Sequence, residues 1–325
     1  MRELYTAVAI SAAMREELKR DPNVVLMGGD VAAMGSSLGT SVGFAKEFGS
    51  DRIIDMPICE SGQASFAVGM AMAGKRVILE YMMVDFQAYA FDGLINQMAK
   101  QRYISGGLWK LPITVRMTQG AGILVGAHHS QCAEGWYQNV PGLKMCAPGN
   151  AHDTYGILKA AIRDDDPVIV FEPKFALGKP GSVPDEEEDF VLEIGKAKLL
   201  REGKDITIIG YQYGLAVAQE VAGKLEQEGV DCELLDLVSL IPYDKEAILK
   251  SVKKTGRVVM VHEAPVRGGF GGEIVSFIAE NAFSDLKAPI VRVGSKEFPI
   301  PYGPGERFVR IGAEEVEAAI RRVLE

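Results

Sequence analysis

The chain has 325 residues, a length that suits two compact domains better than one. Hydrophobic residues make up 47% and charged residues 24%, as in folded globular proteins, and the net charge of −9 argues against a nucleic-acid-binding surface. No apolar stretch approaches the roughly 20 residues that cross a membrane, and the first residues form no signal-peptide core. The four separated cysteines fit neither a disulfide framework nor a Cys-x-x-Cys metal site, so we expect a reduced, cytoplasmic protein.

Alternating strand and helix patterns predict α/β layers around mostly parallel sheets. In the first half of the chain, buried strands are expected at 24–27, 76–81 and 113–117. The spacing of apolar residues over 86–103 predicts a helix. Its apolar face is formed by Phe91, Leu94, Ile95 and Met98.

The clearest boundary falls within 173–205, where prolines and glycines precede the acidic run 185–189. Turn-forming residues followed by like charges break regular structure, so we expect an exposed linker here, which is favoured over a binding function for the acidic run. We therefore predict two domains, 1–190 and 191–325.

A new α/β pattern begins beyond the boundary, with strands expected at 205–211, 232–237 and 257–263 and an amphipathic helix at 215–228. The glycine-rich turn 268–272 then follows a strand and opens a helix, as a dinucleotide-binding fingerprint does. The fingerprint needs a small residue where the chain has Ile274, so we expect a flexible turn whose glycines supply positive φ. No phosphate-binding Gly-x-x-x-x-Gly-Lys-Ser/Thr loop is present.

Glu60 stands out because it follows a proline-bounded apolar segment and precedes a helix rich in small residues. One interpretation makes it an acid at a helix N-terminus, stabilised by the helix dipole. The other makes it a carboxyl group in apolar surroundings that exchanges protons near pH 7. The small-residue helix suits a tight subunit interface as well as a core.

A second polar segment carries the adjacent His128 and His129 in a glycine-rich loop. Adjacent residues seldom reach one metal ion together, so a zinc site that also uses Cys132 is disfavoured. The two histidines are either ordinary surface residues or include an imidazole aimed into a cleft, where it can change charge near neutral pH.

Six motifs occur in the order and spacing of one protein family. They are MPICESG (56–62), AMAG (71–74), HSQ (129–131), VPGLK (140–144), AIRDDDPV (161–168) and LDLVSLIP (235–242). Over essentially its whole length the chain resembles the β subunits of thiamine-diphosphate-dependent 2-oxo acid dehydrogenases of the pyruvate, branched-chain and acetoin types. The resemblance implies a pyrimidine-binding α/β domain, then a transketolase C-terminal-like α/β domain. It also implies an α2β2 heterotetramer that works with a lipoyl acyltransferase.

The resemblance also implies roles for single residues. Glu60 matches the glutamate that hydrogen-bonds N1′ of the aminopyrimidine and so promotes loss of the C2 proton; glutamine could form that bond but could not exchange the proton. Phe86 matches an aromatic residue against the pyrimidine ring, and Met82 is a further candidate for lining that pocket. His129 matches the histidine that stabilises anionic intermediates and assists acyl transfer to lipoamide, and His128 is an additional candidate.

Thiamine enzymes hold the diphosphate through Mg²⁺ with a Gly-Asp-Gly motif, which this chain lacks. The resemblance therefore implies that this chain supplies the pyrimidine half of the site and that the α subunit holds the Mg²⁺. Similar chains also bind K⁺ through main-chain carbonyls, at positions that match Ile113, Ala161, Asp164 and Asp166. One departure is Gly29, where relatives carry an acid.

Two other functions stay open at this point. The chain could be the C-terminal half of a split transketolase-like enzyme that transfers ketol units, or an assembly subunit that kept the fold and lost activity. The segment 81–86 resembles acetoin types slightly more than pyruvate types, so the substrate is left open.

Overall fold

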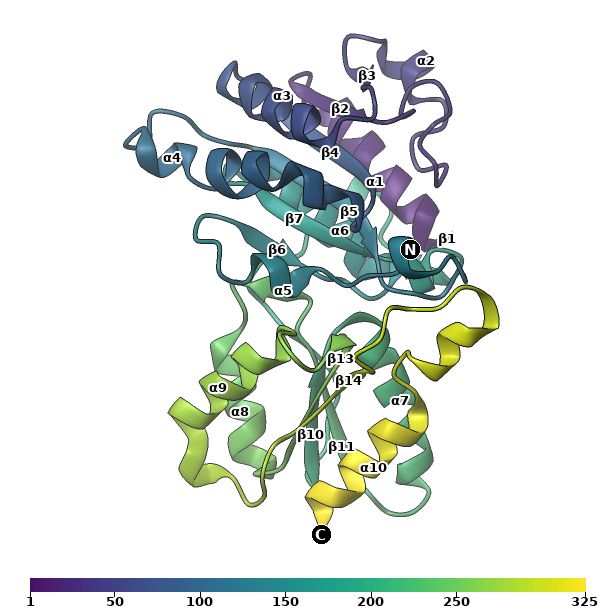
Figure 1. The fold of residues 1–325 in the computed structure, drawn as a ribbon, viewed down its shortest axis with the longest axis vertical. Helices are drawn as coiled ribbons and strands as arrows, with labels where there is room; N and C mark the ends of the chain where they lie inside the picture. Colours follow the sequence, from purple (N-terminus) through teal and green to yellow (C-terminus); the bar gives the residue numbers. More distant parts are fainter. The chain divides into compact units, whose positions relative to one another are not determined.

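The computed structural model describes residues 1–325, which form two compact units (Figure 1). The first unit comprises 1–119 and 136–194, and the second comprises 120–135 and 195–325. The predicted boundary at residue 190 lies close to the end of the first unit, whereas the loop 120–135 groups with the second. None of the helices is long and apolar enough to cross a membrane.

The first unit is built on parallel strands in the order β6-β7-β5-β4-β2-β3. Their bounds are β2 Val24–Gly28, β3 Ile53–Asp55, β4 Arg76–Met83, β5 Ile113–Gln119, β6 Lys144–Cys146 and β7 Val168–Pro173. A short antiparallel pair joins β1 (Arg2–Tyr5) to β8 (Pro180–Val183). Every residue of β2, β5 and β7 is buried. The strands β2 and β7 are accordingly mainly apolar, whereas β5 alternates apolar residues with the buried Thr114, Arg116 and Thr118.

Helices of the first unit pack in two groups (Figure 1). One group pairs α1 (Thr6–Arg20) with α6 (Ala151–Arg163), and the other packs α3 (Glu60–Met72) against the segments that follow β4. The remaining short helices are α2 (Phe44–Phe48) and α4 (Gln101–Ile104), and α5 (Glu134–Tyr137) begins in the segment 120–135 and ends in the first unit. The 3₁₀ segments of the chain are η1 (Phe86–Ala90), η3 (Ala127–His129), η4 (Lys174–Ala176), η5 (Glu186–Glu188), η6 (Phe283–Asp285) and η7 (Gly303–Phe308).

The single helix expected over 86–103 is wrong. The 3₁₀ segment η1 is followed by a π-helix, η2 (Asp92–Met98), and then by the short helix α4. Apolar residues spaced by three and four positions do not distinguish these wider and narrower turns from an α-helix. The tertiary contact is specific: a Cβ atom on Gly93 would lie 2.4 Å from Cβ of Ala64, so only glycine lets η2 approach α3 this closely.

The second unit has a five-stranded sheet in the order β14-β13-β10-β11-β9, parallel except for the edge strand β9. Its strands are β9 Lys198–Arg201, β10 Ile206–Gly210, β11 Cys232–Asp236, β13 Val258–Pro265 and β14 Val291–Ser295, and β12 is Ser239–Ile241. Its helices are α7 Gln212–Glu226, α8 Lys245–Thr255, α9 Gly271–Ala282 and α10 Ala313–Leu324. The expected α/β pattern and its mostly parallel strands are confirmed.

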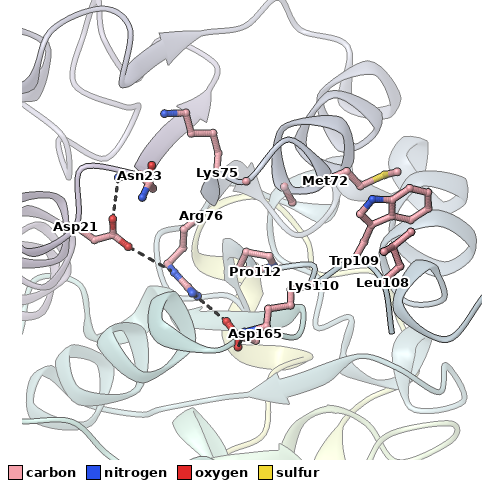
Figure 2. Close-up of a pocket in the computed structure, with 12 residues that line it drawn as sticks. Asp21, Asn23, Met72, Lys75, Arg76, Leu108, Trp109, Lys110, Pro112 and Asp165 are labelled. Atoms are coloured by element: carbon pink, nitrogen blue, oxygen red, sulfur yellow. Dashed lines mark hydrogen bonds and ion pairs between the residues drawn. The ribbon is translucent and has the colours of Figure 1, made fainter. Parts of the chain in front are cut away.

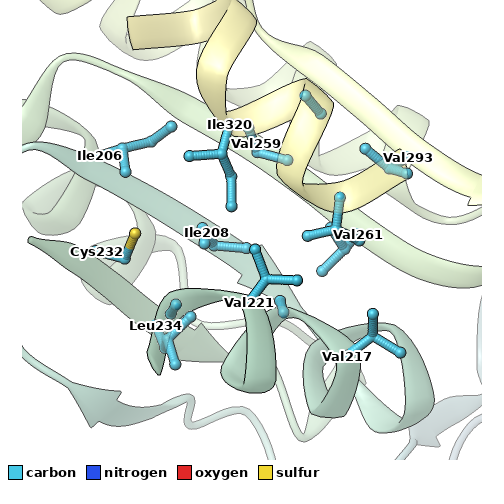
Figure 3. Packing of buried hydrophobic residues seen from close by; sticks show 14 of the residues in the cluster. Ile206, Ile208, Val217, Val221, Cys232, Leu234, Val259, Val261, Val293 and Ile320 are labelled. Atoms are coloured by element: carbon cyan, nitrogen blue, oxygen red, sulfur yellow. The ribbon is translucent and has the colours of Figure 1, made fainter. Parts of the chain in front are cut away.

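Alternate residues of this sheet form its main apolar core (Figure 3). Ile206 and Ile208 of β10 point to the same side as Val259 and Val261 of β13, because side chains of a strand alternate between faces. Helices α7 and α10 cover this side with residues spaced by three or four positions. The members from the helices are Leu215, Val217, Ala218, Val221, Ala222, Leu225, Val316, Ala319, Ile320 and Val323.

The glycine-rich turn after β13 wraps around the buried His262. A Cβ atom would lie 2.5 Å from Cε1 of His262 if placed on Gly269, and 2.7 Å from Cδ2 if placed on Gly271. Only Gly268 of this turn has a positive φ, +71°. These glycines are therefore needed mainly for close packing against an imidazole ring, not for the backbone freedom that the sequence suggested.

The acidic run is exposed, as expected, but it is not free of the fold. Glu186 forms an ion pair with Lys19 at 3.2 Å, and Asp189 pairs with Arg163. The like charges of the run are thus partly neutralised by side chains of α1 and α6.

Candidate active site

Glu60 is the first residue of α3, and its side chain is half-buried. A carboxylate in the first turn of a helix is favourably placed with respect to the helix dipole. The residue before it, Cys59, provides no side-chain cap for the helix. The first turn of α3 must therefore be fixed by other groups.

Two buried side chains supply those contacts. The hydroxyl of Tyr81, on β4, donates a hydrogen bond of 2.8 Å to the main-chain carbonyl of Glu60. The amide nitrogen of Gln63 donates one of 2.8 Å to the carbonyl of Pro57. Glu60 is thus held between a strand of the core and its own helix.

Met82 and Phe86, the other two predicted cofactor-binding residues of this unit, follow Tyr81 closely. Met82 lies near the carboxyl end of β4, Phe86 opens η1, and both are half-buried. The carbonyl of Met82 accepts a hydrogen bond of 2.8 Å from the Thr118 hydroxyl. Helix α3 packs against both β4 and η1, so the elements that carry Glu60, Met82 and Phe86 form one part of the unit.

Gln87 belongs to the same region and was not singled out from the sequence. Its side chain is fully buried, yet neither its amide nitrogen nor its amide oxygen has a hydrogen-bond partner. Buried amides in native proteins almost always have hydrogen-bond partners. This region therefore contains a hydrogen-bond donor and an acceptor, both on Gln87, that the chain alone does not pair. A polar group adjacent to Phe86 fits a region that receives a heteroaromatic ring, although the sequence pattern gave no signal for it.

His128 and His129 lie in the second unit, in the 3₁₀ segment η3. His128 is exposed and His129 is half-buried, with the His129 amide donating to the carbonyl of Gly126 at 3.2 Å. Of the predicted catalytic residues, Glu60 is therefore carried by the first unit and His129 by the second.

The loop 120–135 is fixed by buried acids of its own unit. The amide of Ala121 donates to Glu263 at 2.9 Å, and the Tyr211 hydroxyl donates to Glu134 at 2.6 Å. Gly120 has φ +81°, and a Cβ atom there would lie 2.3 Å from a carboxylate oxygen of Glu263. Burial, followed by the adjacent Glu134, raises the pKa of Tyr211 well above its usual value, so the phenol stays protonated and keeps donating.

The carbonyls implied as K⁺ ligands lie at the start of β5 and at the end of α6. The guanidinium of Arg76 already donates to the carbonyls of Ile162, at 2.9 Å, and of Asp164. The Ala161 carbonyl accepts the amide of Asp164 at 3.2 Å. The side chains of this turn are neutralised by the protein's own cations. The ion pairs are Asp164–Lys144, Asp165–Arg76, Asp165–Lys110 and Asp166–Arg102.

A hollow of about 370 Å³ lies beside this turn (Figure 2). Arg76 lies in it between Asp165, at 3.0 Å, and Asp21, at 3.9 Å, with Trp109 at the other side of the hollow. Met72, the last residue of α3, also lines it, whereas Glu60 is the first residue of that helix. At 1.5 Å per helical residue the two ends of α3 are about 18 Å apart, so the hollow is separate from the site around Glu60.

No group of three or more His, Cys, Asp or Glu side chains is arranged to hold a metal ion. The half-buried carboxyl of Glu60, the apolar side chains of Met82 and Phe86, and the unpaired amide of Gln87 suit a heteroaromatic ring that both stacks and accepts a proton.

Comparisons with known proteins agree with this geometry. Residues 2–179 match the family described as "Transketolase, pyrimidine binding domain", and residues 195–316 match "Transketolase, C-terminal domain". A solved structure described as "Split gene transketolase, inactive beta4 tetramer" is similar, with a TM-score of 0.80 and 27% identity over 99% of this chain and 98% of that one.

Similarity in sequence is higher to one group of β subunits. The chain is 41% identical to the mitochondrial pyruvate dehydrogenase E1 component subunit beta of Dictyostelium discoideum, over 99% of this chain and 91% of that protein. It is 40% identical to the 2-oxoisovalerate dehydrogenase subunit beta of Bacillus subtilis, over 98% and 97% of the two chains. The chain therefore belongs to the family of E1 β subunits of 2-oxo acid dehydrogenases, which have the transketolase-like fold.

Proposed function

We propose that the chain supplies half of the active site of a thiamine-diphosphate-dependent 2-oxo acid dehydrogenase and works only with an α subunit. The observation that carries this proposal is the placement of Glu60 at the start of α3, tied to β4 and next to the segment that carries Phe86. A pyrimidine ring requires a carboxyl group that exchanges a proton with it and an apolar surface against which it lies. Glu60 suits the first requirement and Phe86 the second.

Thiamine diphosphate, when bound, supplies the carbanion that attacks the 2-oxo acid. Glu60 holds a proton at N1′ of the pyrimidine and exchanges it there, which a carboxyl can do and a carboxamide cannot. Phe86 and Met82 orient the ring and exclude water from it. His129 donates a proton to the substrate or stabilises a negative charge on it, and it assists acyl transfer to lipoamide.

The diphosphate and its Mg²⁺ are assigned to the α subunit, because the chain lacks the Gly-Asp-Gly motif. The proposed α2β2 tetramer would cover apolar side chains near Glu60 that a single chain leaves in water. Phe66 on α3 is 46% exposed, and Ile58 and Tyr89 are 86% and 82% exposed. Large exposed apolar residues grouped in this way are typical of an interface. The lipoyl acyltransferase is assigned to the second unit, and the location to the cytoplasm.

The test is to express the chain alone, and together with its cognate α chain, and to measure 2-oxo-acid-dependent dye reduction with thiamine diphosphate and Mg²⁺. We expect activity only in the pair. A panel of pyruvate, branched-chain 2-oxo acids and acetoin then identifies the substrate. An active isolated chain would contradict the split site.

A ketol-transfer enzyme is the second candidate, and the likeness to a split transketolase favours it. The higher identity to dehydrogenase β subunits outweighs that likeness. The same assay separates the two candidates, because a ketol-transfer enzyme would pass units between sugar phosphates and reduce no dye with 2-oxo acids.

We also propose that K⁺ binds at the turn after α6, where it would share the Asp164 carbonyl with Arg76. A carbonyl oxygen has two lone pairs, so both can be accommodated. Replacing choline chloride by KCl at equal ionic strength should raise the unfolding temperature of the α–β pair. An unchanged unfolding temperature would exclude K⁺ binding at this turn and would leave the rest of the proposed function unaffected.

A further inference from the structure

Tyr81 is the one core side chain that reaches directly to the main chain of Glu60. Its hydroxyl donates to the Glu60 carbonyl at 2.8 Å, across 21 residues of sequence. The ring is buried, and Tyr81 pairs with Met117 of β5, one residue beyond the end of the β2–β4 pairing. A phenol fixed in this way is a rigid reference point, because the strand beneath it cannot shift without disturbing the sheet.

The first turn of α3 depends on such a reference point. The N-cap position, Cys59, has non-helical backbone angles and no side-chain cap bond, and both Cys59 and Ser61 are exposed. A helix start without a cap frays readily, since its first amides lack partners, and a donor to a carbonyl does not replace the cap but can anchor the residue that carries that carbonyl. Gln63 ties the preceding loop, and Tyr81 ties Glu60 itself.

We infer that Tyr81 is a positioning residue for Glu60, because its phenol holds the first carbonyl of α3 and so sets the point from which the carboxyl reaches the pyrimidine. This inference rests on the proposed function. In this role Tyr81 neither touches the cofactor nor exchanges a proton. Burial, and then the nearby Glu60, raise the pKa of the phenol, so it remains a hydrogen-bond donor throughout the pH range of the enzyme.

The chain offers a matched control. Tyr137 is also a fully buried tyrosine of the first unit, but its hydroxyl has no hydrogen-bond partner. Tyr81→Phe and Tyr137→Phe therefore delete the same atom from similarly buried rings, and only the first deletion removes a bond to Glu60. Deleting an unpaired buried hydroxyl should be neutral or slightly stabilising.

The experiment uses the assembled α–β pair and two readouts. The first is amide hydrogen exchange of the peptide that carries residues 60–64, measured without cofactor. The second is the rate at which the C2 proton of bound thiamine diphosphate exchanges with solvent, measured over a range of pH with Mg²⁺ present. Affinity for the cofactor and the unfolding temperature are recorded for each variant.

For Tyr81→Phe we expect faster amide exchange at the start of α3 and roughly five- to tenfold slower C2-proton exchange, the effect of losing one hydrogen bond. Tyr137→Phe should match the wild type in both readouts. Wild-type C2 exchange in Tyr81→Phe, or an equal effect of both variants, overturns the inference. So does a Tyr81→Phe pair that no longer assembles, since the phenol would then serve the fold alone.

Glu60→Gln separates this inference from the function on which it rests. If Glu60→Gln abolishes C2 exchange while Tyr81→Phe leaves it unchanged, the function stands and the positioning role fails. If Glu60→Gln has no effect, the proposed function itself fails.

Discussion

Arg116 lies at the centre of a buried ion-pair cluster that joins three strands of the first unit. Its guanidinium lies on β5 and bonds Glu172 on β7 twice, at 2.7 and 2.9 Å, and it also bonds Glu80 on β4. All three side chains are almost fully buried. Burial raises the pKa of Glu172, and the charge of Arg116 opposes that shift.

Arg116→Met should therefore lower the free energy of unfolding by about 3–5 kcal/mol, because it leaves two carboxylates buried without a counter-charge. Urea denaturation of the isolated chain at pH 7 measures the change. The control is Arg102→Met, which removes an ion pair to Asp166 on the surface and should change stability little. Equal effects of the two substitutions would show that the buried cluster is not a stabilising unit.

His262 gives the second unit a dependence on pH. Its Nδ1 hydrogen donates to the Ala264 carbonyl at 3.0 Å, and its Nε2 is buried without a partner. Burial, and to a smaller degree the charge of Arg292, lower the pKa of His262 from 6.5 to about 4. The unfolded chain therefore takes up a proton at a higher pH than the folded chain does, so stability is fully present above pH 6.5 and falls as the pH drops from 6.5 toward 4.

Between pH 7 and pH 5 the wild type should lose about 2 kcal/mol more unfolding free energy than His262→Gln, which cannot be charged. Denaturant titrations of both proteins at the two pH values give this difference directly and cancel the contributions of the carboxylates. Parallel losses in the two proteins would mean that His262 is not held neutral.

At the scale of elements, the packing between α3 and η2 can be tested at Gly93. Gly93→Ala should destabilise the first unit by about 1–3 kcal/mol, because the new methyl group would overlap that of Ala64. Adding Ala64→Gly removes the overlap and should recover part of the loss, less about 1 kcal/mol for glycine within a helix. If the changes in unfolding free energy of Gly93→Ala and Ala64→Gly, measured by denaturant titration, were strictly additive, the close contact between residues 93 and 64 would be contradicted.

The elements that the sequence predicted well are those whose periodicity reports burial directly. The strands β2, β4 and β10 were located from apolar runs, because a strand covered on both faces is mostly apolar. Periodicity failed over 86–103, since the π-helix η2 follows from a tertiary contact at Gly93 that no local pattern encodes. The glycine-rich turn was misjudged for the same reason, because its requirement comes from the ring of His262.

The candidate site was predictable only in part. Glu60 and His129 were singled out by their local sequence, whereas Phe86 and the roles of all three came from motif resemblance, and these roles remain predictions. Tyr81 and Gln87 were not singled out, because a buried phenol or amide in an apolar run reads as ordinary core. Only the folded structure shows that one of them bonds Glu60 and that the other has no partner.

For the assembled molecule, we expect the α subunit to bind the outward face of α3. Gly69 lies on this face, and a Cβ atom there would meet no other atom within 4 Å. Gly69→Trp should leave the isolated chain folded but prevent formation of the α2β2 tetramer, measured by size-exclusion chromatography after co-expression. Gly223→Trp is the matched control, since that glycine is also exposed on a helix, α7, with open space around it. Normal assembly of the Gly69 variant would show that the α subunit binds another surface of the chain.

In the proposed function, this chain contributes the proton-exchanging carboxyl of a site shared with its partner. This contribution is tested most directly by the exchange rate of the C2 proton of thiamine diphosphate bound to the assembled pair, compared between wild type and Glu60→Gln. In Glu60→Gln the exchange should be slower by about a hundredfold or more, with cofactor affinity largely retained, because the substitution removes proton transfer and not binding. An unchanged exchange rate in Glu60→Gln would contradict the proposed function.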